Sequence, residues 1–360
     1  MSSTRDQLEE SARKALAEAK DPRKAAALAA AGTAAAVARL GLKRLRDGDG
    51  RAADSGAYRL LAGEPVGAGM KRVLAARIDD AIAQLREETE SKPPEAIHEA
   101  RKDIKKVRSA LRLVRDEIGK DVWRRENDHH RDVARTLSSF RDAEILVEAL
   151  DGLAERFGPA AQGGFKALRA QLDEETRAAR TDGSMQQAMT TAAAALAPGR
   201  SRIDELPLDG DGWKLIAPGL HRSYRRGRRR LVAVEEDASV TSLHELRKRV
   251  KDLWYQLRLS RDIDSAMIGQ LADHAHDLSD HLGDDHDLAL LRDEVQRREG
   301  VFASPVAQRH LLELVDQRRG ELQFAAISLG ERIYSDKPKK FTKRLENRWE
   351  RWRERKPVAA

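Results

Sequence analysis

The sequence contains no cysteine, few aromatic residues and few prolines. The absence of cysteine excludes disulfides, thiolate nucleophiles and thiolate metal sites, and it fits a reducing compartment. Aromatic residues make up 4% of the chain and proline occurs 11 times, while alanine and leucine supply much of the apolar content. This composition favours helices over strands, because alanine and leucine lose little conformational freedom in a helix.

Long hydrophobic runs are also absent. The N-terminus is polar and lacks the apolar core of a secretion signal. The most apolar window, residues 25–38, is shorter than the ~20 residues that span a bilayer. We therefore expect a cytoplasmic protein with no membrane partner. The window fits an alanine-rich helix in an N-terminal arm, residues 1–56, which ends in a linker rich in glycine and aspartate.

The rest of the chain has a helical pattern, with no sustained period-two alternation that would predict a sheet. Breaks are expected at "LAPGRSR" (196–202), "LPLDGDGW" (206–213) and "SDKPKKF" (335–341). A further helix start is expected at "SKPPEAIHE", where two prolines precede an apolar periodic segment and acidic residues suit the helix dipole. The sequence therefore predicts an all-α fold.

Two segments repeat. "HEARKDIKKVR" (98–108) and "HELRKRVKDLW" (244–254) align at an offset of 146 residues. The offset pairs basic residues of the same type: His98 with His244, Arg101 with Arg247, Lys102 with Lys248, Lys105 with Lys251, and Arg112 with Arg258. "LSSFRDAEIL" (137–146) and "LGDDHDLALL" (282–291) align at 145 residues, which places Arg141 on His286.

Two ordered matches at nearly equal offsets indicate an internal duplication. Each copy has room for about four helices. We therefore predict two four-helix bundles related by pseudo-twofold symmetry, at residues 57–205 and 206–356. Positions between the paired basic residues differ, such as Asp103 against Arg249 and Arg108 against Trp254. We interpret these as surface positions that have drifted.

The paired basic residues form a ridge on each predicted helix. Within each copy they lie inside an arc of about 100°, and the apolar residues face the opposite side. Like charges at i,i+4 spacing repel unless an anion lies between them. Arginine can grip two phosphate oxygens, lysine adds a mobile charge, and histidine makes anion binding sensitive to pH. A solvated basic face is the simpler alternative, and the repetition favours an anion site.

These motifs, together with "HRSYRRGRRRL" (221–231), resemble the CHAD domain, the conserved histidine α-helical domain. The resemblance covers roughly residues 57–356. It implies a basic central channel, formed by both bundles, that binds inorganic polyphosphate, and it suggests an association with polyphosphate granules. Carried over, the channel residues are His98, Arg101, Lys102, Lys105, Arg112, Arg141, Arg222, Arg226, Arg229, His244, Arg247, Lys248, Lys251, Arg258 and His286.

Other patterns leave alternatives open. The stretch 273–287 holds four histidines and many aspartates, which can bind transition metals, although the set is not duplicated. Residues 337–356 combine basic side chains with Trp349 and Trp352, a pattern that fits nucleic acid, although the two tryptophans also have the spacing of a packed helix face. No phosphate loop or nucleophile motif is present. We therefore expect a binding module without a cofactor or metal. A nucleic-acid-binding protein and a metal-dependent polyphosphate hydrolase are the alternatives.

Overall fold

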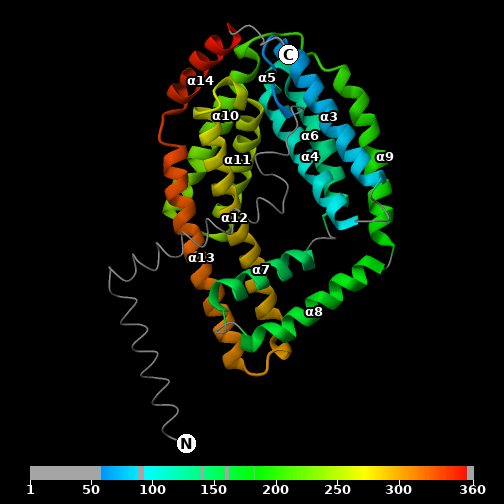
Figure 1. Cartoon of the computed structure of the whole chain (residues 1–360), viewed down its shortest axis with the longest axis vertical. Coiled ribbons are helices and arrows are strands. Elements are labelled where there is room, and N and C mark those ends of the chain that lie inside the picture. Colours follow the sequence, from blue (N-terminus) through cyan, green and yellow to red (C-terminus); the bar gives the residue numbers. More distant parts are fainter. Residues whose placement is uncertain (1–57, 88–92, 139–141, 159–161, 182, 355–360) are drawn as a thin grey trace, which may run out of the picture. The chain divides into compact units, whose positions relative to one another are not determined.

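The structure is a computed structural model that describes residues 58–87, 93–138, 142–158, 162–181 and 183–354. These described residues fall within one compact unit. Across the described ranges the chain forms twelve α-helices, α3 to α14, two short 3-10 helices and no strand (Figure 1). The prediction of an all-α fold is therefore confirmed. The predicted N-terminal arm lies outside the described residues.

The first group of helices packs around α4. It consists of α3 (Val66–Glu87), α4 (Pro93–Leu113), α6 (Lys120–Thr136) and α9 (Ser184–Asp204), with the short α5 (Arg115–Ile118) before α6. Helix α4 begins at the expected pair of prolines and carries Glu95 in its first turn. Its predicted apolar face, from Ile97 to Leu111, is buried. The 3.6-residue periodicity therefore places the basic residues of α4 on another side of the helix.

The second group follows in the sequence. It contains α10 (Trp213–Glu236), α11 (Val240–Leu259), α12 (Met267–Arg297), α13 (Pro305–Ile333) and α14 (Pro338–Arg353). Ser239 caps α11, since its side chain accepts a hydrogen bond from the backbone N–H of Ser242. Ser304 caps α13 in the same way, with Pro305 at the first helical position. The breaks expected at 206–213 and 335–341 are both confirmed.

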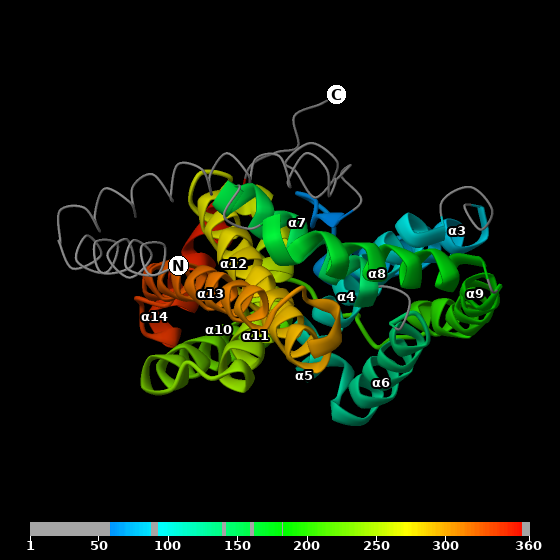
Figure 2. The ribbon, with the colours of Figure 1, turned by 90° about the horizontal axis from the view of Figure 1, so that it is seen from below.

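Helices α7 (Asp142–Phe157) and α8 (Gln162–Thr181) pack against the second group, although they belong to the first half of the sequence. Leucines from both helices, such as Leu153 and Leu168, form a separate apolar core with Leu291 of α12 and Leu311 of α13. Figures 1 and 2 show α7 beside these two helices and α8 running from α7 toward α9. The core therefore interlocks the two halves.

The two segments aligned at an offset of 145 differ in structure. In the first half, α6 ends at Thr136 and α7 begins at Asp142, so residues 137–146 include an interruption. In the second half, residues 282–291 lie inside the uninterrupted α12. The internal duplication and its pseudo-twofold symmetry stay predictions.

The break expected at 196–202 is wrong, because α9 continues through Pro198 to Asp204. A proline inside a helix costs about 3 kcal/mol, and packing compensates for it here. Pro198 is followed by Gly199, which lies against the His129 and His130 rings. The same Ala-Pro-Gly sequence occurs inside α10, where a Cβ on Gly219 would come within 1.9 Å of the Leu113 carbonyl oxygen. Each glycine therefore allows a close helix contact.

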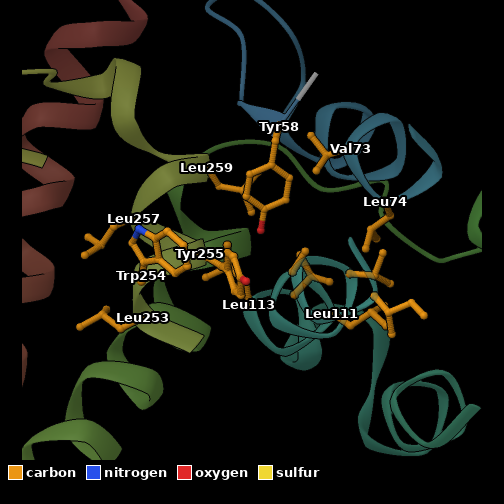
Figure 3. Close-up of a cluster of buried hydrophobic side chains, with 14 of the residues drawn as sticks. Tyr58, Val73, Leu74, Leu111, Leu113, Leu253, Trp254, Tyr255, Leu257 and Leu259 are labelled. Carbon is orange, nitrogen blue, oxygen red and sulfur yellow. The ribbon is translucent and has the colours of Figure 1, made fainter. Parts of the chain in front are cut away.

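Helices α4 and α11, which carry the two ridges, contact each other directly. The Ser109 hydroxyl donates to the Asp252 carbonyl at 2.9 Å, and the Gln256 amide donates to the Ser109 carbonyl at 3.2 Å. Around this contact, Figure 3 shows Leu113 of α4 beside Tyr255 of α11 in a buried apolar cluster. This rigid contact fixes the position of one ridge relative to the other.

Candidate anion-binding site

The two ridges meet at Lys105. Its pKa lies well below the ordinary value, because the surrounding protein desolvates the ammonium and four cations repel its charge: Lys251, Arg101, Arg247 and Lys102. Desolvation is the largest cause of the lowered pKa, and repulsion by the four cations adds to it. These five residues, from α4 and α11, are called the central basic cluster below.

A histidine pair borders the cluster. The rings of His244 on α11 and His286 on α12 lie 4.5 Å apart between centroids. Burial, followed by the charges of His286, Lys248 and Arg247, lowers the pKa of His244 to about 4. Burial and Arg247 also lower the pKa of His286. Both rings are therefore neutral at pH 7.

Three buried nitrogens in this region have no hydrogen-bond partner among the described residues. They are Nδ1 of His244, Nδ1 of His286 and Nε of Arg247. A buried polar atom without a partner costs about 1–3 kcal/mol, so such atoms gather at sites that a ligand completes. Helix α12 packs directly against Arg247, since a Cβ on Gly283 would lie at an ordinary contact distance of 3.5 Å from the guanidinium. The arrangement suits an acceptor-rich ligand.

Other cations of the ridges are held by neighbouring groups. Arg101 donates to the Leu137 carbonyl at the end of α6, at 2.7 Å. Lys102 is buried and pairs with Glu99 at 3.0 Å, while the exposed Lys248 pairs with Glu245 at 2.7 Å. These contacts orient the side chains. Neither glutamate pairs with Lys105 or Arg247 in the described structure.

Several predicted site residues lie away from the central basic cluster. Arg112, Arg222 and Arg226 line a cleft between α4, α10 and α11, together with Arg115, Arg249, Trp123, Ser223 and Asp252. Arg258 lies over the Trp254 ring at 5.1 Å. His98 lies 3.9 Å from Glu99 on the second turn of α4, and Arg229 is exposed on α10. Arg141 lies outside the described residues.

The interpretation of the unmatched positions as surface positions is wrong at Asp103 and Trp254. Asp103 is buried and pairs with Arg77 and Lys106, and Trp254 is buried beneath the His276 ring. Arg249 lines the cleft and was missed by sequence reasoning, because its counterpart Asp103 carries the opposite charge. The one available signal was the difference in charge between Asp103 and Arg249. A residue that is acidic in one copy and basic in the other must have different neighbours in the two copies.

The metal and nucleic-acid patterns have structural outcomes. No group of three or more histidine, aspartate or glutamate side chains in the described ranges is arranged to hold a metal ion. His276 of the histidine-rich stretch instead stacks on Trp254, with ring centroids 4.5 Å apart. Trp349 and Trp352 are buried, and Trp349 packs on Trp213, which confirms that they anchor α14. No described helix is long and apolar enough to cross a membrane.

A family model for the CHAD domain matches residues 72–296, which is more than half of the sequence and includes both ridges. The chain belongs to the CHAD domain family. The CHAD domain of the plant Ricinus communis, known from a crystal structure, is 18% identical and has a TM-score of 0.51. The similarity covers 73% of the present chain and 93% of the plant domain, and it supports the same CHAD fold. No curated protein matches the chain.

Proposed function

We propose that this CHAD domain binds inorganic polyphosphate across the central basic cluster. The observation that carries the proposal is the meeting of five cations from two helices at Lys105. Mutual repulsion makes this arrangement costly in the free protein. An extended chain of phosphates supplies one negative charge per unit and relieves the repulsion along the whole ridge.

The shape of the ligand follows from the two ridges. Lys105 lies on α4 and Lys251 on α11, close enough for their charges to interact, so the cluster extends over two helices. A flexible linear polyanion can contact both helices in turn. The unpartnered nitrogens of Arg247 and the histidine pair offer it further hydrogen-bond donors, once the histidines are protonated.

Nucleic acid is the weaker alternative on physical grounds. Single-stranded nucleic acid binds by stacking bases on aromatic side chains beside a basic groove. The C-terminal tryptophans are buried and not free for stacking. The aromatic partner of Arg258, Trp254, is also buried. The cluster therefore offers charge and hydrogen bonds, which suit a ligand without bases.

We also propose that the domain binds without hydrolysing its ligand. Two carboxylates beside the central basic cluster, Glu99 and Glu245, are held by Lys102 and Lys248. A general base for attack on phosphate needs a free carboxylate or imidazole in reach of a water, so the neutral rings of His244 and His286 are the groups that the test must exclude. The direct test is to incubate the protein with polyphosphate and divalent metals, and to measure phosphate release.

A competition assay tests the choice of ligand. Long-chain polyphosphate should displace a labelled DNA duplex, while duplex DNA should barely displace labelled polyphosphate. The logarithm of the binding constant should fall with the logarithm of salt concentration, by about 0.7 per phosphate contact if the chain behaves like single-stranded nucleic acid. Arg101→Ala and Arg247→Ala should each lower the slope by about one contact. Efficient displacement by duplex DNA would favour the alternative.

A further inference from the structure

Lys105 differs from the neighbouring lysines of α4 in its partners. Lys102 pairs with Glu99 at 3.0 Å, and Lys106 pairs with Asp103 at 3.1 Å. Both of these lysines are buried. Lys105 is exposed, and it forms no ion pair with a carboxylate within the ranges that the structure describes. Small solutes can therefore reach a lysine amine that lacks a counterion among the described residues.

The surroundings of Lys105 disfavour its ammonium form. Desolvation lowers its pKa most, and the positive charges of Lys251, Arg101, Arg247 and Lys102 lower it further. A lysine beside other cations loses its proton more readily, and the neutral amine that results is a nucleophile. Lys105 is thus an accessible lysine whose amine can react with an electrophile.

Arg247 of the same cluster lacks an acceptor at one of its nitrogens. Its Nε is buried and has no hydrogen-bond partner among the described residues. A guanidinium forms its strongest hydrogen bonds with carboxylate and phosphate oxygens. If the charge of Lys105 became negative, its repulsive interactions with the four cations would all become attractive. The modification that fits the cluster best therefore replaces the ammonium with an anionic group.

Carbon dioxide produces such a group from a neutral amine. The lone pair of the lysine nitrogen attacks the carbon, an N–C bond forms, and one C–O π pair moves onto oxygen. The nitrogen then releases a proton to solvent, so that R–NH2 and CO2 give R–NH–COO⁻ and H⁺. Acylation instead leaves a neutral amide, which removes the repulsion but gives the four cations no negative charge.

We propose that Lys105 is a carbamylation site, at which the side-chain amine binds CO2 reversibly and the resulting carbamate is held by Arg247 and the other cations of the cluster. The carbamylation itself does not depend on the proposed function. Its consequence rests on that proposal, because the carbamate places a negative charge where polyphosphate would bind. CO2 and polyphosphate should therefore compete for the cluster.

Chemical trapping on the full chain locates the carbamate. The protein is equilibrated with carbon-13-labelled CO2 and bicarbonate near neutral pH. Triethyloxonium then converts the carbamate into a stable ethyl ester, and peptide mass spectrometry finds the label. Lys105 should carry it, and Lys105→Arg should not. Lys343 is the matched internal control and should stay unlabelled, since it is exposed and a hydrogen bond to Glu346 raises its pKa.

Two further variants test the role of the neighbouring cations. Arg247→Gln should lower the labelling of Lys105 about tenfold or more, because a charge-assisted contact is lost. Lys251→Gln, which removes a different cation of the cluster, should lower it in the same direction. The carbamylation site is overturned if Lys105 carries no label, if Lys343 is labelled to the same extent, or if both variants keep the full label.

Polyphosphate binding with and without CO2, at matched pH and ionic strength, tests the consequence. The apparent Kd of the wild type should rise about twofold when half of the Lys105 amines carry the label. Lys105→Arg keeps the positive charge and forms no carbamate, so CO2 should leave its binding unchanged. Equal weakening in both proteins shows that bicarbonate competes as a simple anion, which overturns the regulatory consequence. Label on Lys105 without polyphosphate binding supports the carbamylation site and refutes the proposed function.

Discussion

Polyphosphate binding should strengthen in acid through His244. In the free protein its pKa is about 4, because burial and neighbouring positive charges disfavour the imidazolium. A polyanion bound to the cluster adds negative charge beside the His244 ring, and this charge favours the imidazolium. If binding restores an ordinary pKa of about 6.5, the complex takes up a proton that the free protein lacks between these two values.

The magnitude follows from linkage. The factor by which protonation of His244 tightens binding is (1 + 10^(6.5 − pH))/(1 + 10^(4 − pH)). This ratio is about 1.1 at pH 7.5 and about 11 at pH 5.5, so we expect roughly tenfold tighter binding at the lower pH. At pH 5.5 about 0.9 proton should accompany each binding event at this histidine.

Calorimetry in two buffers of different ionisation enthalpy measures both quantities. His244→Gln should remove most of the proton uptake and the acid gain, and a second loss should come from His286→Gln, whose ring lies 4.5 Å away. His310→Gln, on the half-exposed side chain of α13, is the control. Protonation of the terminal phosphates contributes equally to all variants. An unchanged pH dependence in His244→Gln would refute the reasoning.

Two stability predictions follow from helix packing. Gly219→Ala should lower the free energy of unfolding by about 1–3 kcal/mol, since its Cβ would meet the backbone of α4. Gly320 has open space around it, so Gly320→Ala should raise the free energy of unfolding by about 0.4–1 kcal/mol. Urea midpoints measure both changes, and equal effects of the two variants would contradict the contact between Gly219 and α4. His130 is buried with a pKa of about 4, so the unfolded chain binds its proton first and stability should fall by up to about 3 kcal/mol from pH 6.5 to 4. His130→Gln should flatten that acid loss, and an unchanged profile would contradict it.

The periodic elements of this fold could be predicted from the sequence, and the interlocking of its halves could not. The apolar face of α4 repeats every three to four residues, so its burial follows from local pattern. The packing of α7 on α12 depends on contacts between residues distant in the chain, which leave no local signal. The sequence predicted a helix break at Pro198, and α9 continues there because Gly199 packs against histidines of α6, a contact that the sequence does not show.

The site shows the same division. The repeat predicts that Lys105 and Lys251 serve equivalent roles, and the structure brings them together. A helical wheel gives the side of a helix on which Arg112 lies, but not the helix that covers it. Asp252 of α11 and the arginines of α10 draw Arg112 into a separate cleft. The sequence therefore shows which side of a helix is charged, and the tertiary contacts decide which charged residues lie in the same site.

The central claim is that one polyphosphate chain contacts both ridges at once. Calorimetry of long-chain polyphosphate with Lys105→Gln, Lys251→Gln and the double variant tests it most directly. Each single change should weaken binding by a similar factor, about tenfold or more for a charge-assisted contact, and the double change should come close to abolishing it. The melting temperature in buffer should hold or rise as repulsion is relieved. Full affinity in either single variant, or wild-type affinity in the double variant, would contradict the account.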